Sequence, residues 1–342
     1  MKNSILKFLE NNPKISSKEL FDGLSSNKSY ATLKRELTTL LSEELIQTIG
    51  KGKGTKYLLS ENYELLKPIN LKDYYQNEID DRSIIKDYNF SLLQEIFPNN
   101  NLFSTSELNQ LTILQEQYKN NSSLLTPIAY KKELDRLAID LSWKSSQIEG
   151  NTYSLLETEH LLTKKETAAG KTKEEAIMLL NHKNTLDFII NNPGYLHPLS
   201  LSKIEDIHSL LVKDLQVERN IRKRRIGISG TNYKPLDNEF QIREALISMC
   251  SLINLKENVF EKALISLLFL SYIQAFSDGN KRTARIISNA ILIREDYCPI
   301  SFRTISSIDY KKAMLLFYEQ NNISAFKAIF INQFKFAVKT YF

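Results

Sequence analysis

The chain has 342 residues, of which 42% are hydrophobic and 25% charged, so it can bury the cores of two or three domains of ordinary size. No run of eighteen apolar residues occurs, and the N-terminus, MKNSILKFLENNPK, has no signal-peptide core; we therefore expect a cytoplasmic protein without a membrane partner. Two cysteines and four scattered histidines argue against a disulfide framework or a structural zinc site.

Residues 1–60 show three short helical patterns followed by a strand, a turn and a strand. A capping box at Ser16–Glu19 begins the second helix, and Tyr30 to Leu41 repeats apolar residues at helical spacing. Two short apolar runs, 45–49 and 56–59, flank the glycine-rich segment 50–54, which is typical of a hairpin. This order resembles a winged helix-turn-helix, and we predict such a domain over these sixty residues.

The same sixty residues carry ten basic and six acidic side chains, a net charge of +4 out of +5 for the whole chain. A basic surface of this kind is typical of a protein that contacts DNA phosphates. In a winged helix, Lys34 and Arg35 of the third helix would face the major groove, and Lys53 of the wing would meet the backbone. The alternative is that the domain serves protein contact or dimerisation, so a homodimer stays open.

The rest of the chain is predicted to be almost entirely helical, so the fold class is mainly α. Residues 61–128 show short helical stretches separated by asparagine-rich loops at 99–101 and 120–121, which indicates a connector that packs on a larger helical domain over residues 129–342. The helices of that domain are predicted at 130–148, 173–192, 200–214, 239–256, 260–274, 281–295, 307–320 and 324–341. Residues 225–235 break the pattern with turn-forming residues that predict a short hairpin.

The most informative segment is the loop after the helix 260–274. Residues 263–273 are apolar nearly all round, so this helix must be buried, and a new helical face begins after Lys281. The loop between the two helices therefore delivers a helix N-terminus into the core of the domain. There the backbone N–H groups of Gly279, Asn280 and Lys281 are expected to be unpaired and to favour an anion.

Charged side chains surround this predicted anion site. Asp278 offers a hard oxygen ligand for a magnesium ion that accompanies phosphates. Arg282 and Arg285 share one helix face as two phosphate-binding forks. The alternative is an ordinary helix start, at which an Asp-Gly-Asn turn is common. It is disfavoured because a carboxylate and two arginines converge at the end of a buried helix, where an unpaired charge is costly.

Residues 276–285 are similar to the signature motif of the Fic family, His-x-Phe-x-Asp/Glu-Gly-Asn-Gly/Lys-Arg-x-x-Arg. Every fixed position from Phe276 to Arg285 matches, and only the leading histidine is replaced, by Gln274. The resemblance extends over roughly residues 70–342 and implies a Fic-type helical domain with a small β-hairpin flap. It also implies that the chain uses ATP and Mg²⁺ and transfers AMP to a hydroxyl group of an unknown target protein.

The resemblance further implies roles for single residues. The catalytic positions of the motif are occupied by Gln274, Phe276 and Asn280. Asp278 would hold the magnesium ion. The residues expected to bind nucleotide, the last two near its adenine and ribose, are Gly279, Asn280, Lys281, Arg282, Arg285, Asn289 and Tyr310. The flap residues, which would align the target's side chain, are Gly230, Thr231, Tyr233 and Pro235.

A second element of the family lies upstream. Ser145 and Glu149 precede Gly150 and Asn151 in a segment that is similar to the Fic inhibitory motif, Ser/Thr-x-x-x-Glu-Gly/Asn. A carboxylate in the last turn of a helix faces the negative end of the helix dipole and needs a cation nearby. Arg285 is the expected partner of Glu149, and the pair would keep Arg285 from gripping the γ-phosphate. The alternative is that Glu149 is a surface acid before a C-cap glycine.

Gln274 limits the predicted activity. In the family, the histidine at this position takes the proton of the target hydroxyl as it attacks the α-phosphate, whereas a glutamine amide has no basic nitrogen near pH 7. Losing a positioned general base typically lowers a rate by about 10²–10⁴-fold. His208 and His197 lie beside apolar helical patterns, so we expect packing or surface residues there and no replacement base.

Three functions stay open at this point. The first is a Fic-type protein AMP transferase that Glu149 inhibits and Gln274 weakens or inactivates. The second is a nucleotide-sensing, DNA-binding transcriptional regulator with a catalytically dead Fic domain. The third is removal of AMP from a modified protein, with Glu149 activating water. It is disfavoured because Gln274 also cannot supply the acid that the leaving hydroxyl needs.

Overall fold

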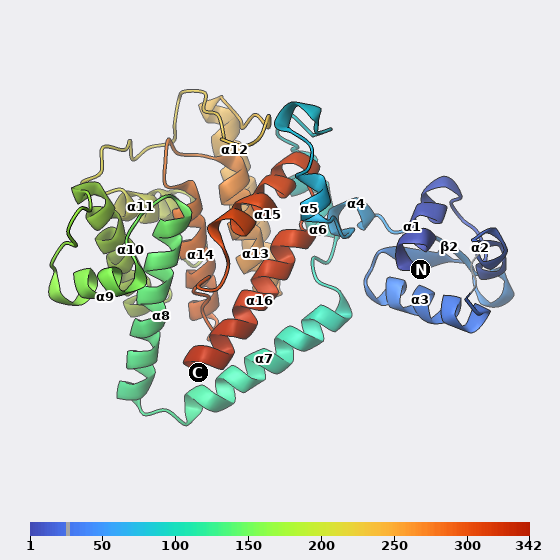
Figure 1. The fold of residues 1–342 in the computed structure, drawn as a ribbon, viewed down its shortest axis with the longest axis horizontal. Helices are drawn as coiled ribbons and strands as arrows, with labels where there is room; N and C mark the ends of the chain where they lie inside the picture. The colour runs from blue at the N-terminus through green and yellow to red at the C-terminus, as the bar shows by residue number, and fades with distance from the viewer. Residues whose placement is uncertain (25–27) are drawn as a thin grey trace.

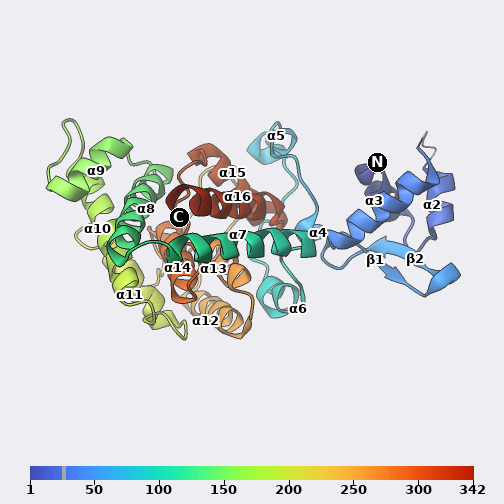
Figure 2. The ribbon, with the colours of Figure 1, turned by 90° about the horizontal axis from the view of Figure 1, so that it is seen from below.

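The computed structural model describes residues 1–24 and 28–342, and its fold is mainly helical, as the sequence predicts (Figure 1). The N-terminal unit, formed by α1, α2, α3, β1 and β2, lies at one end of the long axis, and α9 lies at the other end (Figure 2). The helices are α1 (Lys2–Asn11), α2 (Ser17–Gly23), α3 (Tyr30–Ser42), α4 (Tyr63–Leu66), α5 (Leu71–Tyr74), α6 (Phe97–Asn99), α7 (Thr105–Ser123), α8 (Pro127–Ile148), α9 (Leu155–Lys164), α10 (Lys173–Asn191), α11 (Leu201–Leu211), α12 (Glu239–Leu255), α13 (Val259–Ile273), α14 (Asn280–Arg294), α15 (Ser307–Gln320) and α16 (Ser324–Tyr341). The strands are β1 (Ile46–Ile49) and β2 (Lys56–Leu59).

The N-terminal unit consists of α1, α2, α3 and the hairpin β1–β2, in the order that the sequence predicts. Ser16 and Glu19 form the predicted capping box at the start of α2. The two strands pair antiparallel, with Ile46 opposite Leu59, and an isolated bridge joins Ile15 to Tyr57. This unit buries leucines and isoleucines from all three helices, and these residues belong to the same contiguous apolar cluster as the core of the helical body.

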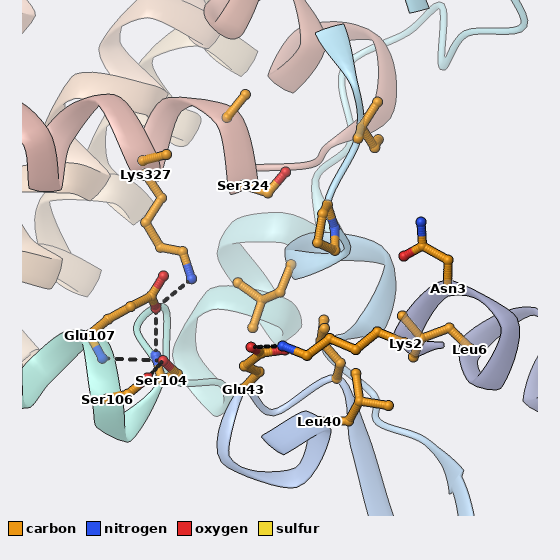
Figure 3. Close-up of a pocket in the computed structure, with 16 residues that line it drawn as sticks. Lys2, Asn3, Leu6, Leu40, Glu43, Ser104, Ser106, Glu107, Ser324 and Lys327 are labelled. Atoms are coloured by element: carbon orange, nitrogen blue, oxygen red, sulfur yellow. Dashed lines mark hydrogen bonds and ion pairs between the residues drawn. The ribbon is translucent and has the colours of Figure 1, made fainter. Parts of the chain in front are cut away.

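A cavity of about 470 Å³ lies between the N-terminal unit and the helical body (Figure 3). The ion pair Lys2–Glu43 lies on the wall formed by α1 and α3, and Lys327–Glu107 lies on the wall formed by α16 and α7. Each pair thus joins residues of its own wall. Neither of these two ion pairs therefore crosses the junction between the walls.

The segment 61–128 differs from its prediction. It contains the 19-residue helix α7, which runs along the body beside α16 and includes Asn120 and Asn121 in its last turns (Figures 1 and 2). The prediction of a loop at 120–121 was therefore wrong, because burial of Leu111, Leu114 and Tyr118 against the body outweighs the low helix propensity of asparagine. The helix α9 was also not predicted; the capping box Ser154–Glu157 begins it.

The body is built around α13, which packs along α14. Thirteen of its fifteen residues are buried, as the all-round apolar pattern of its sequence predicts. The helices α8, α10, α11, α12, α15 and α16 surround this pair (Figure 1). Among the described residues, no helix is both long enough and apolar enough to cross a bilayer.

The predicted hairpin at 225–235 does not form. Within the described residues the only sheet is β1–β2, and the segment 225–235 has an irregular backbone. Its edge pairs with the connector instead: Lys234 N–H donates to Lys86 O at 2.7 Å, beside a parallel bridge between Asp87 and Lys234. The turn-forming residues were thus interpreted correctly as a turn, but the pairing partner comes from a distant part of the chain.

Candidate functional site

Two residues with left-handed backbone shape the loop between α13 and α14. Gln274 ends α13 with a φ of 52°, and Gly279 precedes α14 with a φ of 84°. Glycine is favoured at 279 by this left-handed φ, and a Cβ there would also lie close to its neighbours, 3.2 Å from His208 Nε2 and 3.3 Å from Val212 Cγ1. A left-handed backbone is costly for glutamine, so the contacts around Gln274 must hold it in place.

The side chain of Asn280 holds this loop closed. Its Oδ1 accepts the N–H of Phe276 at 2.9 Å, while its Nδ2 donates to Phe276 O at 2.8 Å and to Gln274 Oε1 at 3.1 Å. Both amide hydrogens are therefore used inside the loop. Asn280 is predicted to bind nucleotide, and its backbone N–H in the first turn of α14 is the one donor that no other described residue takes.

Gln274 is held on both sides of its amide. The residue is only 7% exposed, its Nε2 donates to Ser271 O at 2.7 Å, and its Oε1 accepts from Asn280. The side chain therefore lies in one orientation, at the position where the family motif has histidine. It can donate and accept hydrogen bonds there, but it cannot take up a proton near neutral pH.

Phe276 and His208 form a stacked pair beneath the loop. Their ring centroids lie 3.7 Å apart with an interplanar angle of 5°, and both residues are fully buried. His208 Nε2 lies 2.9 Å from Asp278 O, and burial lowers the pKa of His208. His208 is thus a packing residue, as the sequence predicts, and it supports the loop from α11.

Asp278 is the exposed carboxylate of the loop. Its Oδ1 accepts the N–H of Gly279 at 2.6 Å, and its Oδ2 accepts from Arg282 Nη2 at 2.8 Å. The prediction that the Gly279 N–H is unpaired was therefore wrong, because the preceding carboxylate reaches back to it. The side chain is still 58% exposed, so its oxygens can also reach a metal ion.

Arg282 and Arg285 place unsatisfied donors inside the protein. Arg282 is 1% exposed and Arg285 is fully buried. Among the described residues, Arg282 Nε and Nη1 and Arg285 Nη1 have no hydrogen-bond partner. Buried donors without partners are costly, and guanidinium donors are satisfied best by phosphate or carboxylate oxygens. The helix α14 also begins without a side-chain cap, so its first N–H groups face the same kind of ligand.

The predicted ion pair between Glu149 and Arg285 is present. Arg285 Nη2 donates to Glu149 Oε1 at 2.6 Å and to Ser145 O at 3.0 Å, while Nε donates to Ser145 Oγ at 2.8 Å. Lys281 Nζ lies 3.6 Å from the other carboxylate oxygen of Glu149. The ring of Tyr310 lies 5.3 Å from the guanidinium carbon of Arg285. These contacts hold Arg285 toward α8.

Glu149 is ionised in this setting. Burial by itself would raise the pKa of Glu149, but the charges of Arg285 and Lys281 outweigh burial and lower the pKa below its ordinary value. Because the folded state lowers this pKa, the pair contributes its full stability above the ordinary pKa of a glutamate. That contribution is lost as the pH falls through the lowered pKa.

Other predicted residues lie around this centre without open side chains. Asn289 Nδ2 donates to Arg285 O at 2.9 Å and its Oδ1 accepts from Ile300 N, and Tyr310 is fully buried. Gly150 turns the chain after α8 with a φ of 105°. Asn151 Nδ2 donates to Glu175 O at 2.9 Å and fixes the start of the next segment on α10.

The predicted flap, residues 225–235, is held by the connector and by aromatic stacking. Gly230 O accepts from Arg82 Nη2 at 2.8 Å, and Thr231 Oγ1 accepts the N–H of Tyr233 at 3.1 Å. Tyr233 is buried and stacks on Tyr272 with ring centroids 4.7 Å apart. A cavity of about 500 Å³ opens beside residues 225–228 and 231–234, and Pro235 closes its end of the flap in a buried position.

Two buried residues near the site were missed from the sequence. His182 of α10 is fully buried, and burial together with the charges of Arg285 and Arg282 lowers its pKa far below the ordinary value, so a neutral ring faces the arginines. Arg222 is 1% exposed and contacts Gln274 O at 2.6 Å. Neither has a local signal, since His182 lies in an ordinary helical pattern and Arg222 in a run of basic residues.

The fold and the loop define a helical domain in which an uncapped helix start with two buried arginines lies next to an internal carboxylate. Residues 198–292, which include this loop, match the model of the Fic/DOC family. The chain therefore carries a Fic/DOC family domain. This agrees with the resemblance of residues 276–285 to the Fic signature.

Two curated relatives carry the name of this family. The chain is 26% identical over 171 residues to "Protein adenylyltransferase fic-1" of Caenorhabditis briggsae, covering 48% of this chain and 33% of that protein. It is 26% identical over 184 residues to "Protein adenylyltransferase Fic" of Aedes aegypti, covering 51% of this chain and 36% of that protein. The chain thus spans about a third of the length of these relatives.

Solved structures share the fold. Fic-1 from C. elegans matches with a TM-score of 0.60 and 20% identity, covering 69% of this chain and 71% of that chain. A Fic domain containing signaling protein from Bacteroides thetaiotaomicron matches with a TM-score of 0.56 and 21% identity, covering 68% of this chain and 96% of that chain. At these identities the likeness establishes the fold alone.

Proposed function

We propose that the chain is a Fic-type protein AMP transferase that carries AMP from ATP to a Ser, Thr or Tyr hydroxyl of a target protein. In this proposal Glu149 inhibits the transfer, and Gln274 weakens or abolishes it. The observation that carries the proposal is the pair of buried arginines, Arg282 and Arg285, at the uncapped start of α14, with nitrogens that have no partner within the described part of the chain. The Fic/DOC family domain and the names of the curated relatives support the same chemistry.

The residues at this helix start fit a magnesium nucleotide. Arg282 Nε and Nη1 and Arg285 Nη1 are donors that await acceptors, and phosphate oxygens supply acceptors. Asp278 is exposed and carries a carboxylate, the ligand type that magnesium takes from proteins when phosphates supply others. A magnesium ion there would offset the negative charge of the phosphates. Lys281, which lies near Glu149, adds a further positive charge to the same helix start.

The transfer itself requires a proton acceptor. The hydroxyl oxygen of the target forms a bond to the α-phosphorus, the bond from that phosphorus to the bridging oxygen breaks, and pyrophosphate leaves. The hydroxyl proton must go to a base. Gln274 stands at that position with an amide that accepts a hydrogen bond but no proton, and its Oε1 is already bonded to Asn280. The chain can therefore orient an acceptor hydroxyl and transfers AMP slowly or not at all.

Glu149 restricts the nucleotide half of the site, the part around Arg282 and Arg285. It takes Arg285 Nη2, and Ser145 takes Nε, which leaves one of the three guanidinium nitrogens for a ligand. A γ-phosphate competes with Glu149 for the same guanidinium. Because the pKa of Glu149 is lowered, this competition persists at neutral pH.

The test of this function uses ATP labelled at either the α- or the γ-phosphate. In the chain with Gln274→His and Glu149→Gly, magnesium-dependent label from α-labelled ATP is expected on candidate proteins or on the chain itself, with no label from γ-labelled ATP. Arg282→Met in the same background is the control that removes a phosphate-binding group. Absence of α-label in the restored chain would remove the transferase, and label from γ-labelled ATP would replace it by a kinase.

A second candidate is a nucleotide-sensing, DNA-binding regulator with a catalytically dead Fic domain. The observation that favours it is the N-terminal unit, whose three helices and hairpin have the order of a winged helix. Lys34 and Arg35 on α3 and Lys53 between the strands are all exposed. These positions suit phosphate contacts of a helix and a wing.

DNA binding by this unit is expected to depend on salt. Replacing Lys34, Arg35 and Lys53 by glutamine should lower the affinity for duplex DNA, and the slope of log K against log salt should shrink by about 0.9 per lost phosphate contact. Binding is measured by fluorescence anisotropy over a salt series. The matched control removes three exposed charges from the body, at Lys131, Lys132 and Lys164. Equal losses in both variants, or no DNA affinity at low salt, would rule out this function.

A further inference from the structure

Arg222 is a buried cation whose hydrogen-bond partners are all backbone carbonyls. Its Nε donates to Gln274 O at 2.6 Å, its Nη1 donates to Arg224 O at 2.8 Å, and its Nη2 donates to Leu236 O. Its own N–H donates to Ala275 O at 3.0 Å. The residue is 1% exposed, and among the described residues no carboxylate forms an ion pair with it.

The carbonyls that it joins come from separate parts of the site. Gln274 and Ala275 begin the loop between α13 and α14, residues 274–279, which we call the motif loop. Arg224 and Leu236 lie directly before and after the flap segment 225–235. One planar guanidinium therefore fixes both ends of the flap to the start of the motif loop. A guanidinium presents five N–H donors in a rigid plane, so it can hold three carbonyls at set positions, which an ammonium cannot.

The cost of this arrangement indicates that the geometry matters. Burial removes the guanidinium from water, and it lowers the pKa of Arg222. Gln274 needs such support, since its φ of 52° is unfavourable for a residue with a side chain. The bond to Gln274 O holds this backbone and with it the direction in which the side chain at position 274 leaves the chain.

We propose that Arg222 is a positioning residue that sets the flap against the side chain at position 274. It thereby serves the acceptor half of the site, where the target hydroxyl would lie between the flap and position 274, and not the nucleotide half around Arg282 and Arg285. The inference rests on the proposed AMP transfer for its kinetic consequence. Its geometric part is independent of that activity. Arg282 and Arg285 hold the nucleotide half, and Arg222 makes no hydrogen bond to either of them.

The kinetic test uses the chain with Gln274→His and Glu149→Gly. Adding Arg222→Met is expected to lower kcat/KM for the acceptor by about 100-fold, the loss that a displacement of about 1 Å can cause. The Kd of a non-hydrolysable ATP analogue with magnesium should stay within about twofold, the range that an unchanged nucleotide half allows. Arg222→Lys should recover part of the activity, because an ammonium reaches some of the carbonyls.

The matched control is Leu111→Ala in α7. Leu111 is fully buried and packs on the body away from the flap, so its replacement is expected to lower Tm without changing the site. If Arg222→Met weakens the nucleotide analogue as much as it lowers acceptor turnover, or behaves like Leu111→Ala at equal Tm, Arg222 is only structural. That result overturns the proposal.

Hydrogen exchange separates this proposal from the transferase itself. In the parent chain with Arg222→Met, amides of residues 225–236 and 274–279 are expected to exchange at least about tenfold faster, while the hydrogen-bonded interior turns of α14 keep their protection. Unchanged exchange in the flap overturns the proposal even if the transferase is real. Faster exchange in a chain that transfers no AMP after restoration supports the positioning geometry and removes the transferase alone.

Discussion

Restoring histidine at position 274 in a chain that also carries Glu149→Gly is expected to raise the rate of AMP transfer by about 10²–10⁴-fold over Glu149→Gly alone. Position 274 is nearly buried at the start of the motif loop, and its present amide donates to Ser271 O and accepts from Asn280. A histidine there adds the base that the acceptor hydroxyl needs. Single-turnover incorporation of α-labelled ATP measures this rate.

Four chains separate the two effects: the parent, each single variant and the double variant. Gln274→His alone should remain slow, because Glu149 still occupies Arg285. Nucleotide affinity, measured by titration, should rise with Glu149→Gly and change little with Gln274→His. If Glu149→Gly alone already matches the double variant, another group acts as the base and Gln274 does not limit the reaction.

Arg285→Met is expected to lower the free energy of unfolding by about 3–5 kcal/mol, the usual cost of leaving one member of a buried ion pair without its partner. Arg285 is fully buried and Glu149 has a side chain that is 16% exposed. Lys281, at 3.6 Å, is then the one remaining cation in ion-pair distance of Glu149 among the described residues. Urea unfolding measures the loss, with Arg285→Met/Glu149→Leu as the matched double variant.

The double variant should recover most of the lost stability, because no buried charge is left unpaired. The difference between the parent and Arg285→Met should also narrow as the pH falls. Without Arg285, burial raises the pKa of Glu149. As the pH falls, the carboxylate of the variant is therefore protonated at a higher pH than that of the parent, which loses its ion pair only at lower pH. An equal loss in the single and double variants would show that Arg285 acts through its packing against Tyr310 instead.

Local patterns in the sequence predicted most elements that position the site. All eight helices predicted in the body are present, and their bounds differ by a few residues, because each has a long apolar pattern, periodic in most of them and all round in α13. The pairing of Glu149 with Arg285 was predicted from the unfavourable place of a carboxylate at a helix end. The motif loop also lies at the end of a buried helix, as predicted.

Errors arose where distant segments decide the local structure. The flap was predicted as a hairpin, but Lys234 pairs with Lys86 of the connector, about 150 residues earlier in the chain. The helix α7 runs through two asparagines because it packs on α16. A further error was local: the Gly279 N–H is taken by the carboxylate of its direct neighbour Asp278, a contact that depends on the loop geometry.

The sequence by itself determined the mainly helical class, the composition of the motif loop, and the replacement of the motif histidine by Gln274, since these depend on residue type and short-range spacing. Only the tertiary structure decided which donors are used and which are left open. Arg222 and Arg282 are both buried arginines. The first is satisfied by carbonyls from the motif loop and both ends of the flap, whereas two nitrogens of the second have no partner among residues 1–24 and 28–342. The physical reason is that hydrogen-bond satisfaction inside a protein depends on groups far apart in the chain, which periodicity does not encode.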